Sequence, residues 1–323
     1  MGKRTCPILV TGGAGFVGSA LVRELLDQNS DAPIVVLDNL FNGKVTHLPD
    51  SPWVTFRDVD LRDARAVLET FQEVQPKTVY HLAALHFIPY CNGHPAETMQ
   101  VNVVGTQNVL EACRAYQPDR LVIASTAAVY PIREGAITED QAAGPTDIYG
   151  LSKWVNERQL ELYSRQTDTR CAAARLFNAF GPRETNPHVI PEILDQMVRG
   201  VTEIAIGNVK PKRDYVYTSD IAKALITIAE KHSHSFRVYN VGTGQEHSVE
   251  EVLERLADIS GMPLRFSVEP NRVRASDRLH LLCDRSRMAQ ELGWVPEHTL
   301  ESGLVALWQF VSREAAQTQL QTV

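Results

Sequence analysis

Long apolar segments are missing from this 323-residue sequence. No run of 18 apolar residues occurs, and the N-terminus leads directly into a short strand-like run. A membrane-spanning helix needs about 20 mainly apolar residues, and a secretory signal needs an apolar core behind its basic start. The sequence therefore predicts neither a membrane span nor a signal peptide, and we expect a cytoplasmic protein.

Cysteine is scarce. The five cysteines are odd in number and widely scattered, and no C-x-x-C pair occurs among them. Disulfide frameworks and structural zinc sites need paired or regularly spaced cysteines. We therefore expect reduced thiols and no metal site. The cysteines are Cys6, Cys91, Cys113, Cys171 and Cys283.

An excess of basic charge is also absent, since the formal net charge is −7 at pH 7. This balance argues against nucleic acid or an anionic membrane surface as the main partner. Basic residues that matter should therefore be local, against an anionic small molecule. The length and the 44% hydrophobic content fit a soluble globular chain with a large core and a smaller lobe.

A glycine-rich turn near the N-terminus is the most specific local pattern. An apolar run at 7–11 precedes Gly12, Gly15 and Gly18, a helical pattern follows, and a second apolar run ends in Asp38. This order of strand, glycine turn, helix, strand and acid predicts a dinucleotide site. Asp38 can accept both ribose hydroxyls and would repel a 2′-phosphate, which favours NAD over NADP. The alternative is a glycine turn that serves helix–strand packing alone.

Strand-like and helical segments then alternate along the chain, as in a doubly wound α/β fold with a parallel sheet. Ligands of such folds bind at the carboxyl ends of the strands. We expect strands at 53–56, 78–82, 120–125, 172–177 and 204–208. We expect helices at 59–72, 96–116, 249–259 and 300–311, with a frayed tail after Arg313.

Tyr149 and Lys153 lie four residues apart, so a helix would place them on one face. An ammonium beside a phenol favours the phenolate, and we expect it to lower the pKa of Tyr149. Such a group can take a proton from an alcohol near neutral pH. Thr126 ends a predicted strand, where its hydroxyl can meet a sugar hydroxyl and the phenol. Alternatives are an uninvolved exposed helix pair and a threonine that caps a backbone group.

Together these motifs resemble the extended short-chain dehydrogenase/reductases, and within them the NAD-dependent nucleotide-sugar epimerase/dehydratase family, most closely the UDP-hexose 4-epimerases. The resemblance spans 8–296 and also rests on the segments 60–63, 81–84, 125–130 and 175–182. It implies NAD as cofactor, a UDP-sugar as substrate, a homodimer formed through helices 96–116 and 147–166, and catalysis by Tyr149, Lys153 and Thr126. Residues 1–180 would bind NAD. Residues 181–323 would mainly form the nucleotide-sugar lobe, with segments near 205–245 returning to the main sheet.

The resemblance also implies which residues contact each ligand. The implied cofactor contacts are Gly12, Gly15, Phe16, Val17, Gly18, Asp38, Asn39, Asn42, Gly43, Asp60, Leu61, Leu82, Ala83, Ala84, Asn102, Tyr149, Lys153 and Phe177. The implied substrate contacts are Thr126, Tyr149, Asn178, His188, Val189, Ile206, Arg213, Arg274 and Asp277. His86 replaces a cofactor-contacting lysine of many 4-epimerases, which leaves its role open. We expect His232 and His234 on the surface.

The residues after Thr126 bear on the reaction. Related dehydratases follow the threonine with an Asp-Glu pair, whereas Ala127 and Ala128 stand here and can neither donate nor accept a proton. This difference favours an epimerase. Against this, the segment 207–214 resembles that of some dehydratases, and Pro131 replaces the glycine that usually follows Val129 and Tyr130 in the family. A dehydratase or another NAD-dependent oxidoreductase therefore stays open. Leu281, near the position that gates 2-substituents, leaves the sugar undecided, and an NAD-sensing protein without activity is the nonenzymatic alternative.

Overall fold

The computed structural model describes residues 6–28, 32–272 and 278–321. Its centre is a seven-stranded sheet of order β12-β7-β5-β4-β1-β2-β3, in which all neighbours are parallel. The predicted doubly wound α/β fold is therefore confirmed. Strand order reverses between β1 and β4, which is where such folds open a ligand crevice. The strands are β1 (Ile8–Thr11), β2 (Ile34–Asp38), β3 (Val54–Asp58), β4 (Thr78–His81), β5 (Arg120–Thr126), β7 (Arg170–Leu176) and β12 (Phe236–Val241).

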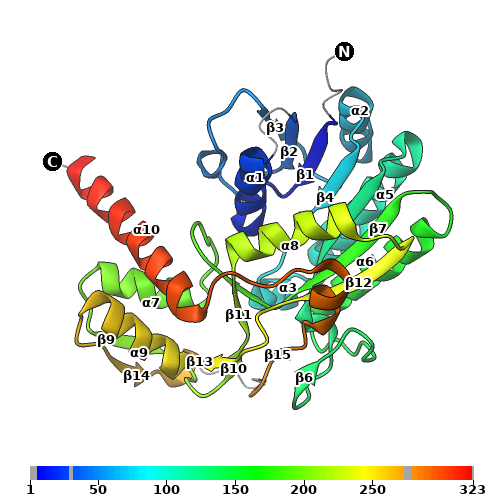
Figure 1. Ribbon diagram of the computed structural model, residues 1–323. Coiled ribbons are helices and arrows are strands. Elements are labelled where there is room, and N and C mark those ends of the chain that lie inside the picture. The colour runs from blue at the N-terminus through cyan, green and yellow to red at the C-terminus, as the bar shows by residue number, and fades with distance from the viewer. Residues whose placement is uncertain (1–5, 29–31, 273–277, 322–323) are drawn as a thin grey trace.

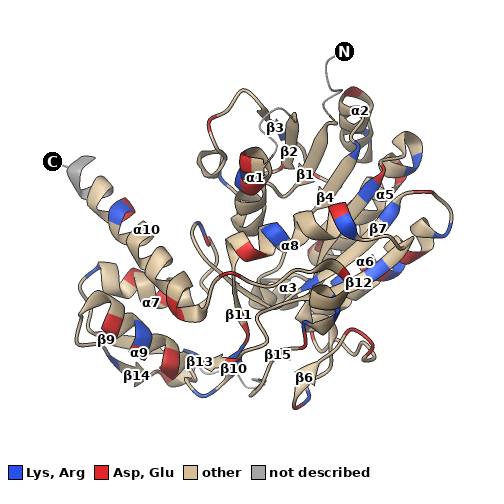
Figure 2. Cartoon of the chain, viewed as in Figure 1, with Lys and Arg blue, Asp and Glu red and all other residues tan. Residues whose placement is uncertain are grey.

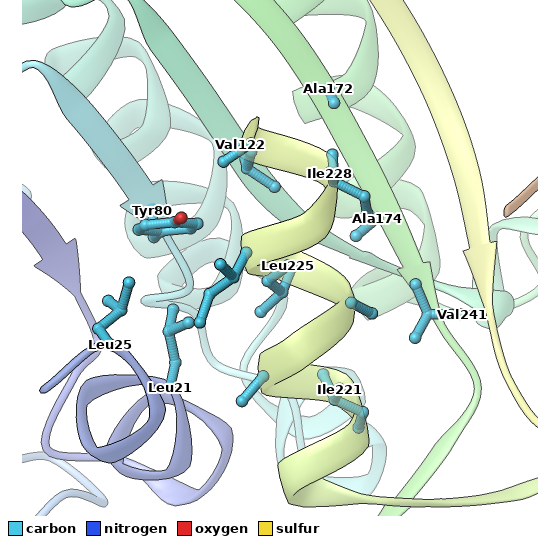
Figure 3. Close-up of a cluster of buried hydrophobic side chains, with 14 of the residues drawn as sticks. Leu21, Leu25, Tyr80, Val122, Ala172, Ala174, Ile221, Leu225, Ile228 and Val241 are labelled. Atoms are coloured by element: carbon cyan, nitrogen blue, oxygen red, sulfur yellow. The ribbon is translucent and has the colours of Figure 1, made fainter. Parts of the chain in front are cut away.

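Helices α1 (Phe16–Gln28) and α8 (Thr218–Lys231) cover one face of this sheet. Leu225 and Ile228 of α8 lie against Val122 and Ala174 of the central strands, with α1 alongside (Figure 3). The apolar side chains of both helices leave water together with one face of the strands. This burial fixes the helix that starts at the glycine turn to the strands that carry the site.

Helices α2 (Ala64–Val74), α5 (Gly105–Tyr116) and α6 (Ile148–Ser164) cover the opposite face. Leu121 and Ile123 of β5 belong to this second core, whereas Val122 belongs to the first. Successive side chains of a strand point to opposite faces, so a fully buried strand is apolar throughout. The uninterrupted apolar run in β5 follows from this double burial.

A smaller lobe lies beside the carboxyl end of the main sheet and has its own core (Figure 1). Its principal elements are α7 (Val189–Val198), β9 (Glu203–Ile206), β11 (Tyr215–Tyr217), α9 (Val249–Ser260), β14 (Arg265–Val268) and α10 (Leu300–Gln321). Between them the chain returns to the large unit as α8 and β12. The short remaining elements are α3 (Ile88–Gly93), α4 (Pro95–Met99), β6 (Ala136–Ile137), β8 (Asn178–Phe180), β10 (Lys212–Arg213), β13 (His247–Ser248) and β15 (Leu282–Cys283).

Two expected helix boundaries were wrong, and a third expected helix has the expected bounds but is irregular inside. The helix α2 begins at Ala64 because the Asp63 carboxylate accepts hydrogen bonds from the amides of Arg65 and Ala66 at 3.1 and 3.0 Å, which leaves 59–63 as a loop. The expected helix 96–116 contains a π-helical turn, Gln100–Val104, between α4 and α5. The final helix does not end near Arg313, since α10 continues to Gln321.

Across residues 6–28, 32–272 and 278–321, no helix combines the length and the apolar character that crossing a bilayer requires.

His232 is buried, contrary to the expectation of a surface position. Only 1% of the residue is exposed, and within the described part of the chain neither ring nitrogen has a hydrogen-bond partner. The loop after α8 is held inward by Arg170, whose Nη1 donates to the His232 carbonyl at 3.3 Å. Burial, together with the charge of Arg170, lowers the pKa of His232 to about 4.

This burial predicts a specific loss of stability in acid. The pKa of His232 is about 4 in the folded chain and about 6.5 when unfolded. Between these values the unfolded chain binds a proton that the folded chain does not, so the free energy of unfolding decreases as the pH falls. We expect a contribution of up to about 3 kcal/mol, which His232→Leu removes. Urea unfolding at pH 7 and at pH 4.5 measures it.

The matched control is His234→Leu, because His234 is exposed. It should show the same pH dependence as the unmodified protein. An identical loss of stability in His232→Leu and in the unmodified protein would contradict the assignment.

Candidate active site

A cavity of about 1590 Å³ lies between the carboxyl edge of the main sheet and the smaller lobe. Its wall includes the glycine turn after β1, the ends of β4 and β5, the start of α6, and segments of α7 and α10. Both halves of the chain therefore contribute to one site. Its size allows two ligands to lie side by side.

Tyr149 and Thr126 meet at this wall through a hydrogen bond between their side chains. The Asp147 carboxylate caps α6 by accepting from the amide of Gly150 at 2.7 Å. Gly150 is needed here, because a Cβ atom would lie 2.4 Å from the Ala128 carbonyl oxygen. The start of α6 therefore packs directly on the turn after β5 and brings the phenol to the threonine. The Thr126 hydroxyl also accepts from the Ala128 amide at 3.1 Å, so the capping role holds as well.

Lys153 is buried one turn further along α6, and its Nζ donates to the Ala124 carbonyl at 2.8 Å. Burial lowers the pKa of Lys153 to about 8. Burial raises the pKa of Tyr149, although the hydrogen bond from Thr126 acts in the opposite direction. The prediction that the pKa of Tyr149 is lowered is therefore wrong when only the groups of the protein itself act on the phenol. The reason is that the lysine is turned to a backbone carbonyl and that both groups have left water.

A buried ion pair supports this catalytic group from behind. Both oxygens of Glu157 accept from Arg175, at 2.8 Å from Nε and 2.7 Å from Nη2. Glu157 also accepts from the Ser125 hydroxyl at 2.6 Å. The third nitrogen of Arg175 donates to the phenol of Tyr130 at 2.7 Å, and this phenol donates to Asn240 at 2.7 Å. One polar chain thus connects α6 with β5, β7 and β12.

The glycine turn after β1 is required by close backbone contacts. Gly12 has φ of 71°, and a Cβ atom there would lie 2.6 Å from the amide nitrogen of Ala83. A Cβ atom at Gly18 would lie 2.0 Å from the Gly12 carbonyl oxygen. These glycines are therefore needed for close packing of the backbone. The glycine turn also exposes the N-terminus of α1 to the cavity, where the first amides of the helix and the helix dipole suit a phosphate.

Asp38 ends β2 beside this turn, with its side chain directed at the backbone. One carboxylate oxygen accepts from the Ala14 amide at 3.1 Å, and the other accepts from the Leu40 amide at 2.9 Å. Burial raises the pKa of Asp38. Each oxygen retains a lone pair for a further donor, so the residue fits the two hydroxyls of a ribose.

Asp60 and Asn39 form a second polar group at the same end of the cavity. The amide of Asn39 donates to Asp60 at 3.1 Å, and Arg62 binds the same carboxylate through two nitrogens at 2.9 and 2.6 Å. The hydrogen bonds from Arg62 lower the pKa of Asp60 to about 2. Both residues and the neighbouring Leu61 line the cavity.

Asn102 is not one of the residues that line the cavity in the described part of the chain. Its amide lies on the π-helical turn, bonds both backbone groups of Leu85 at 2.8 and 2.9 Å, and donates to Ser152 at 2.9 Å. It therefore supports the turn after β4 and the start of α6, and it does not present a polar atom to a cofactor. The direct cofactor contact that the resemblance implied for Asn102 is therefore not supported.

Arginines converge on the far side of the cavity. Arg213 and Arg278 both line it, and Arg213 Nη1 donates to the Arg278 carbonyl at 2.6 Å. Arg278 in turn donates to the Tyr130 carbonyl at 2.6 Å. Elsewhere basic and acidic residues are interspersed along helices such as α6 and α8 (Figure 2). This local positive charge fits an anionic ligand, and guanidinium groups suit phosphate oxygens.

Known proteins resemble this chain over nearly its whole length. The sequence profile of the family described as GDP-mannose 4,6 dehydratase matches residues 9–306. The chain belongs to the extended short-chain dehydrogenase/reductases that act on nucleotide sugars. It is 32% identical to a UDP-glucose 4-epimerase of Corynebacterium glutamicum, with 94% of this chain and 95% of the relative covered.

Two solved structures extend this likeness. A Thermus thermophilus UDP-glucose 4-epimerase in complex with NAD has 31% identity and a TM-score of 0.86, covering 94% of this chain and 98% of its own. A Thermotoga maritima UDP-glucose 4-epimerase with UDP-glucose has 29% identity and a TM-score of 0.88, covering 95% and 99%. The likeness includes both the large unit and the smaller lobe.

Most residues that the family resemblance assigns to the site do line the cavity. Arg274 and Asp277 lie outside the described residues. Those at the cofactor end are Gly12, Gly15, Phe16, Val17, Gly18, Asp38, Asn39, Asn42, Gly43, Asp60, Leu61, Leu82, Ala83, Ala84, Tyr149, Lys153 and Phe177. Those on the substrate side are Thr126, Asn178, His188, Val189, Ile206 and Arg213.

Several cavity residues were missed. Arg183, in the left-handed region at φ of 67°, stacks on Phe310 of α10 at 5.0 Å, and Glu184 follows it. Arg183 directly continues the recognised segment 175–182, so a longer motif would have included it. Phe310 had no such signal, because its place at the cavity depends on how α10 packs.

No cluster of three or more histidine, cysteine, aspartate or glutamate side chains with metal-binding geometry occurs in the described ranges 6–28, 32–272 and 278–321.

The buried ion pair yields a stability prediction. Arg175→Met would leave the Glu157 carboxylate buried without its partner, which should cost about 3–5 kcal/mol of unfolding free energy. Urea denaturation measures this loss. The control is Arg57→Met, because the Arg57–Glu73 pair is exposed and should contribute little. Equal stability of the two variants would show that the buried pair is dispensable.

Proposed function

We propose that the chain is an NAD-dependent nucleotide-sugar epimerase that interconverts the C4 epimers of a UDP-hexose. The observation that carries the proposal is the contact between Thr126 and Tyr149 beside Lys153, followed by Ala127 and Ala128 on the cavity wall. The C. glutamicum, T. thermophilus and T. maritima relatives, all named as UDP-glucose 4-epimerases, support it. Residues 1–180 would bind NAD, and 181–323 would mainly bind the nucleotide sugar.

In this reaction Tyr149 removes the proton from the C4 hydroxyl while a hydride leaves the same carbon. Bound NAD⁺ supplies the hydride acceptor and a positive charge near the phenol. The Thr126 hydroxyl orients the sugar hydroxyl toward Tyr149. Lys153 uses one of its three donors on Ala124, which leaves two for the nicotinamide-side ribose. Its charge favours the phenolate once the ligands exclude water.

Return of the hydride to the other face of C4, together with return of the proton from Tyr149 to the C4 oxygen, would give the epimer. The 4-keto sugar has to turn in the site before this step, while its diphosphate is held by arginines such as Arg213. Ala127 and Ala128 present no group that could protonate a leaving hydroxyl. The ketone is therefore reduced again, and no water is eliminated.

A nucleotide-sugar dehydratase is the second candidate, and one pair of residues favours it. The Glu184 side chain is 5% exposed and lies 3.3 Å from His188, and both residues line the cavity. A carboxylate–imidazole pair can transfer protons. It could replace the acid and base that are missing after Thr126.

Fewer observations bear on the identity of the sugar and on the location of the protein in the cell. Leu281 lies in the cavity wall near the position that gates 2-substituents in 4-epimerases, and it is neither the tyrosine that would exclude an N-acetyl group nor the small residue that would admit one. It leaves glucose, its N-acetylamine and a uronic acid as substrates to compare. Cys91, Cys113, Cys171 and Cys283 are buried thiols that form no disulfide, which supports a reducing, cytoplasmic location.

A homodimer is supported by the outer surface of α5 and α6. These helices are joined by hydrogen bonds such as the one from Gln159 to Gln107 at 3.0 Å. Val104, at the end of the π-helical turn that leads into α5, and Leu162 on α6 are 49% and 56% exposed, which is high for large apolar residues. A second copy would cover them across a two-fold axis.

We therefore expect Val104→Glu and Leu162→Glu together to give a monomer, because the charges would have to be buried at the interface. Sedimentation velocity measures the change in mass. Leu68→Glu on α2 is the matched control, since Leu68 is also exposed. A monomeric unmodified protein would refute the dimer.

The reaction is tested by incubating the protein with UDP-glucose, UDP-N-acetylglucosamine and UDP-glucuronic acid and following the products by NMR. We expect the C4 epimer of one of them and no net consumption of NAD. A 4-keto-6-deoxy product would select the dehydratase. No product from UDP-, dTDP- and GDP-sugars would refute both.

The variant for this assay is Tyr149→Phe, which should lower kcat by about 10²–10⁴ because it removes the general base. It retains the ring and therefore the packing of α6. Turnover within a few-fold of the unmodified protein would show that another group takes the proton.

A further inference from the structure

Two segments from opposite walls of the cavity meet at His86. One follows β4, and the other precedes α7. The Nε2 atom of His86 lies 2.9 Å from the Nδ2 atom of Asn186, and its other ring nitrogen bonds the Ala84 carbonyl. An amide NH₂ group can only donate, so Nε2 accepts, and the second nitrogen carries the proton that it donates to Ala84. The ring is therefore held as one neutral tautomer, with both nitrogens in use.

The segment on the β4 side is anchored to the main sheet and to the helix behind it. The amide of Ala83 donates to the Thr11 hydroxyl at 3.3 Å, and this hydroxyl lies 2.7 Å from the ring of His81. Two residues further on, Leu85 is held through both backbone groups by Asn102. His86 therefore projects from a rigid base beside the nicotinamide end of the cavity.

The segment on the α7 side is equally compact. The backbone amide of Asn186 donates to the Glu184 carboxylate at 3.1 Å. The backbone amide of His188 donates to the backbone carbonyl of Asn186 at 2.7 Å. The ring of Phe87, next to His86, meets the ring of His188 edge-on at 5.6 Å. Glu184 and His188 face the cavity, whereas Asn186 is 7% exposed and turned toward His86.

We propose that His86 is a positioning residue that clasps the turn after β4 to the segment 184–188, and so holds the cofactor wall and the nucleotide-sugar wall of the cavity in register. This role rests on the proposed function, because hydride transfer needs both ligands at a fixed separation. A lysine ammonium would offer no acceptor to the Nδ2 atom of Asn186, since it has three donors and no lone pair. His86 and Asn186 therefore hold the two segments together only as a hydrogen-bonded pair.

The test compares His86→Leu, which removes both hydrogen bonds, with His86→Gln, which keeps an acceptor and a donor. In the NAD-bound protein we expect His86→Leu to lower kcat by about tenfold or more, since small misplacements of reactants are costly. The Kd of UDP alone should stay within about threefold, because UDP contacts one wall only. His86→Gln should keep most of the activity. His234→Leu is the matched histidine control.

Asn186→Leu tests the partner. If the two residues act together, the double variant with His86→Leu should be no slower than either single variant. Three results would overturn the clasp. The kcat losses of the two single variants could multiply in the double variant, kcat could be unchanged in His86→Leu, or His86→Gln could be as slow as His86→Leu.

Hydrogen–deuterium exchange separates failure of the clasp from failure of the proposed function. In the NAD-bound protein, His86→Leu should speed exchange of the amides in 184–188, and His86→Gln should not. This readout needs no turnover, so it decides the clasp even if no UDP-sugar is converted. Unchanged exchange in His86→Leu would overturn the clasp, whereas absence of product from the unmodified protein concerns the proposed function.

Discussion

The buried pair of Glu157 and Arg175 is the interaction on which the site depends. Glu157 lies one turn beyond Lys153 on α6, and Arg175 is near the end of β7, so the pair fixes the catalytic helix to the sheet. Two buried charges cost several kcal/mol of desolvation each, and they are tolerated only when every oxygen and nitrogen finds a partner. Ser125 and Tyr130 complete this set. The position of Tyr149 therefore follows from a network that reaches β12, far along the chain.

Burial also sets the electrostatics of the catalytic pair. The protein raises the pKa of Tyr149 and lowers that of Lys153, so both neutral forms are favoured by desolvation. A positive nicotinamide ring beside the phenol would act against this effect and favour the phenolate. The same desolvation strengthens each interaction that develops during hydride transfer.

The smaller lobe completes the site. It brings Arg213, Arg278 and the segment 184–188 to the strand ends of the large unit, and α10 closes one end of the cavity with Phe310. The backbone at Arg213 is held by Asp214, whose carboxylate is buried and accepts from Thr243, Gly244 and Cys283. The chain crosses between the two units more than once, so the cavity is bounded by elements whose positions depend on each other.

The sequence by itself determined the sheet, the glycine turn, Asp38 and the Thr126–Tyr149–Lys153 set, because these depend on local periodicity and on short motifs whose chemistry allows few substitutes. Tertiary structure decided what depends on burial and on distant partners. The pKa of Tyr149 is raised where the local pair predicted lowering, and His232 is inside because Arg170 holds its loop. Asn102 turns to Leu85 and Ser152, away from the cavity. Asn186 reaches His86 from 100 residues further along the chain. Spacing along a chain reports neighbours within an element, whereas desolvation and long-range hydrogen bonds exist only once the elements have packed.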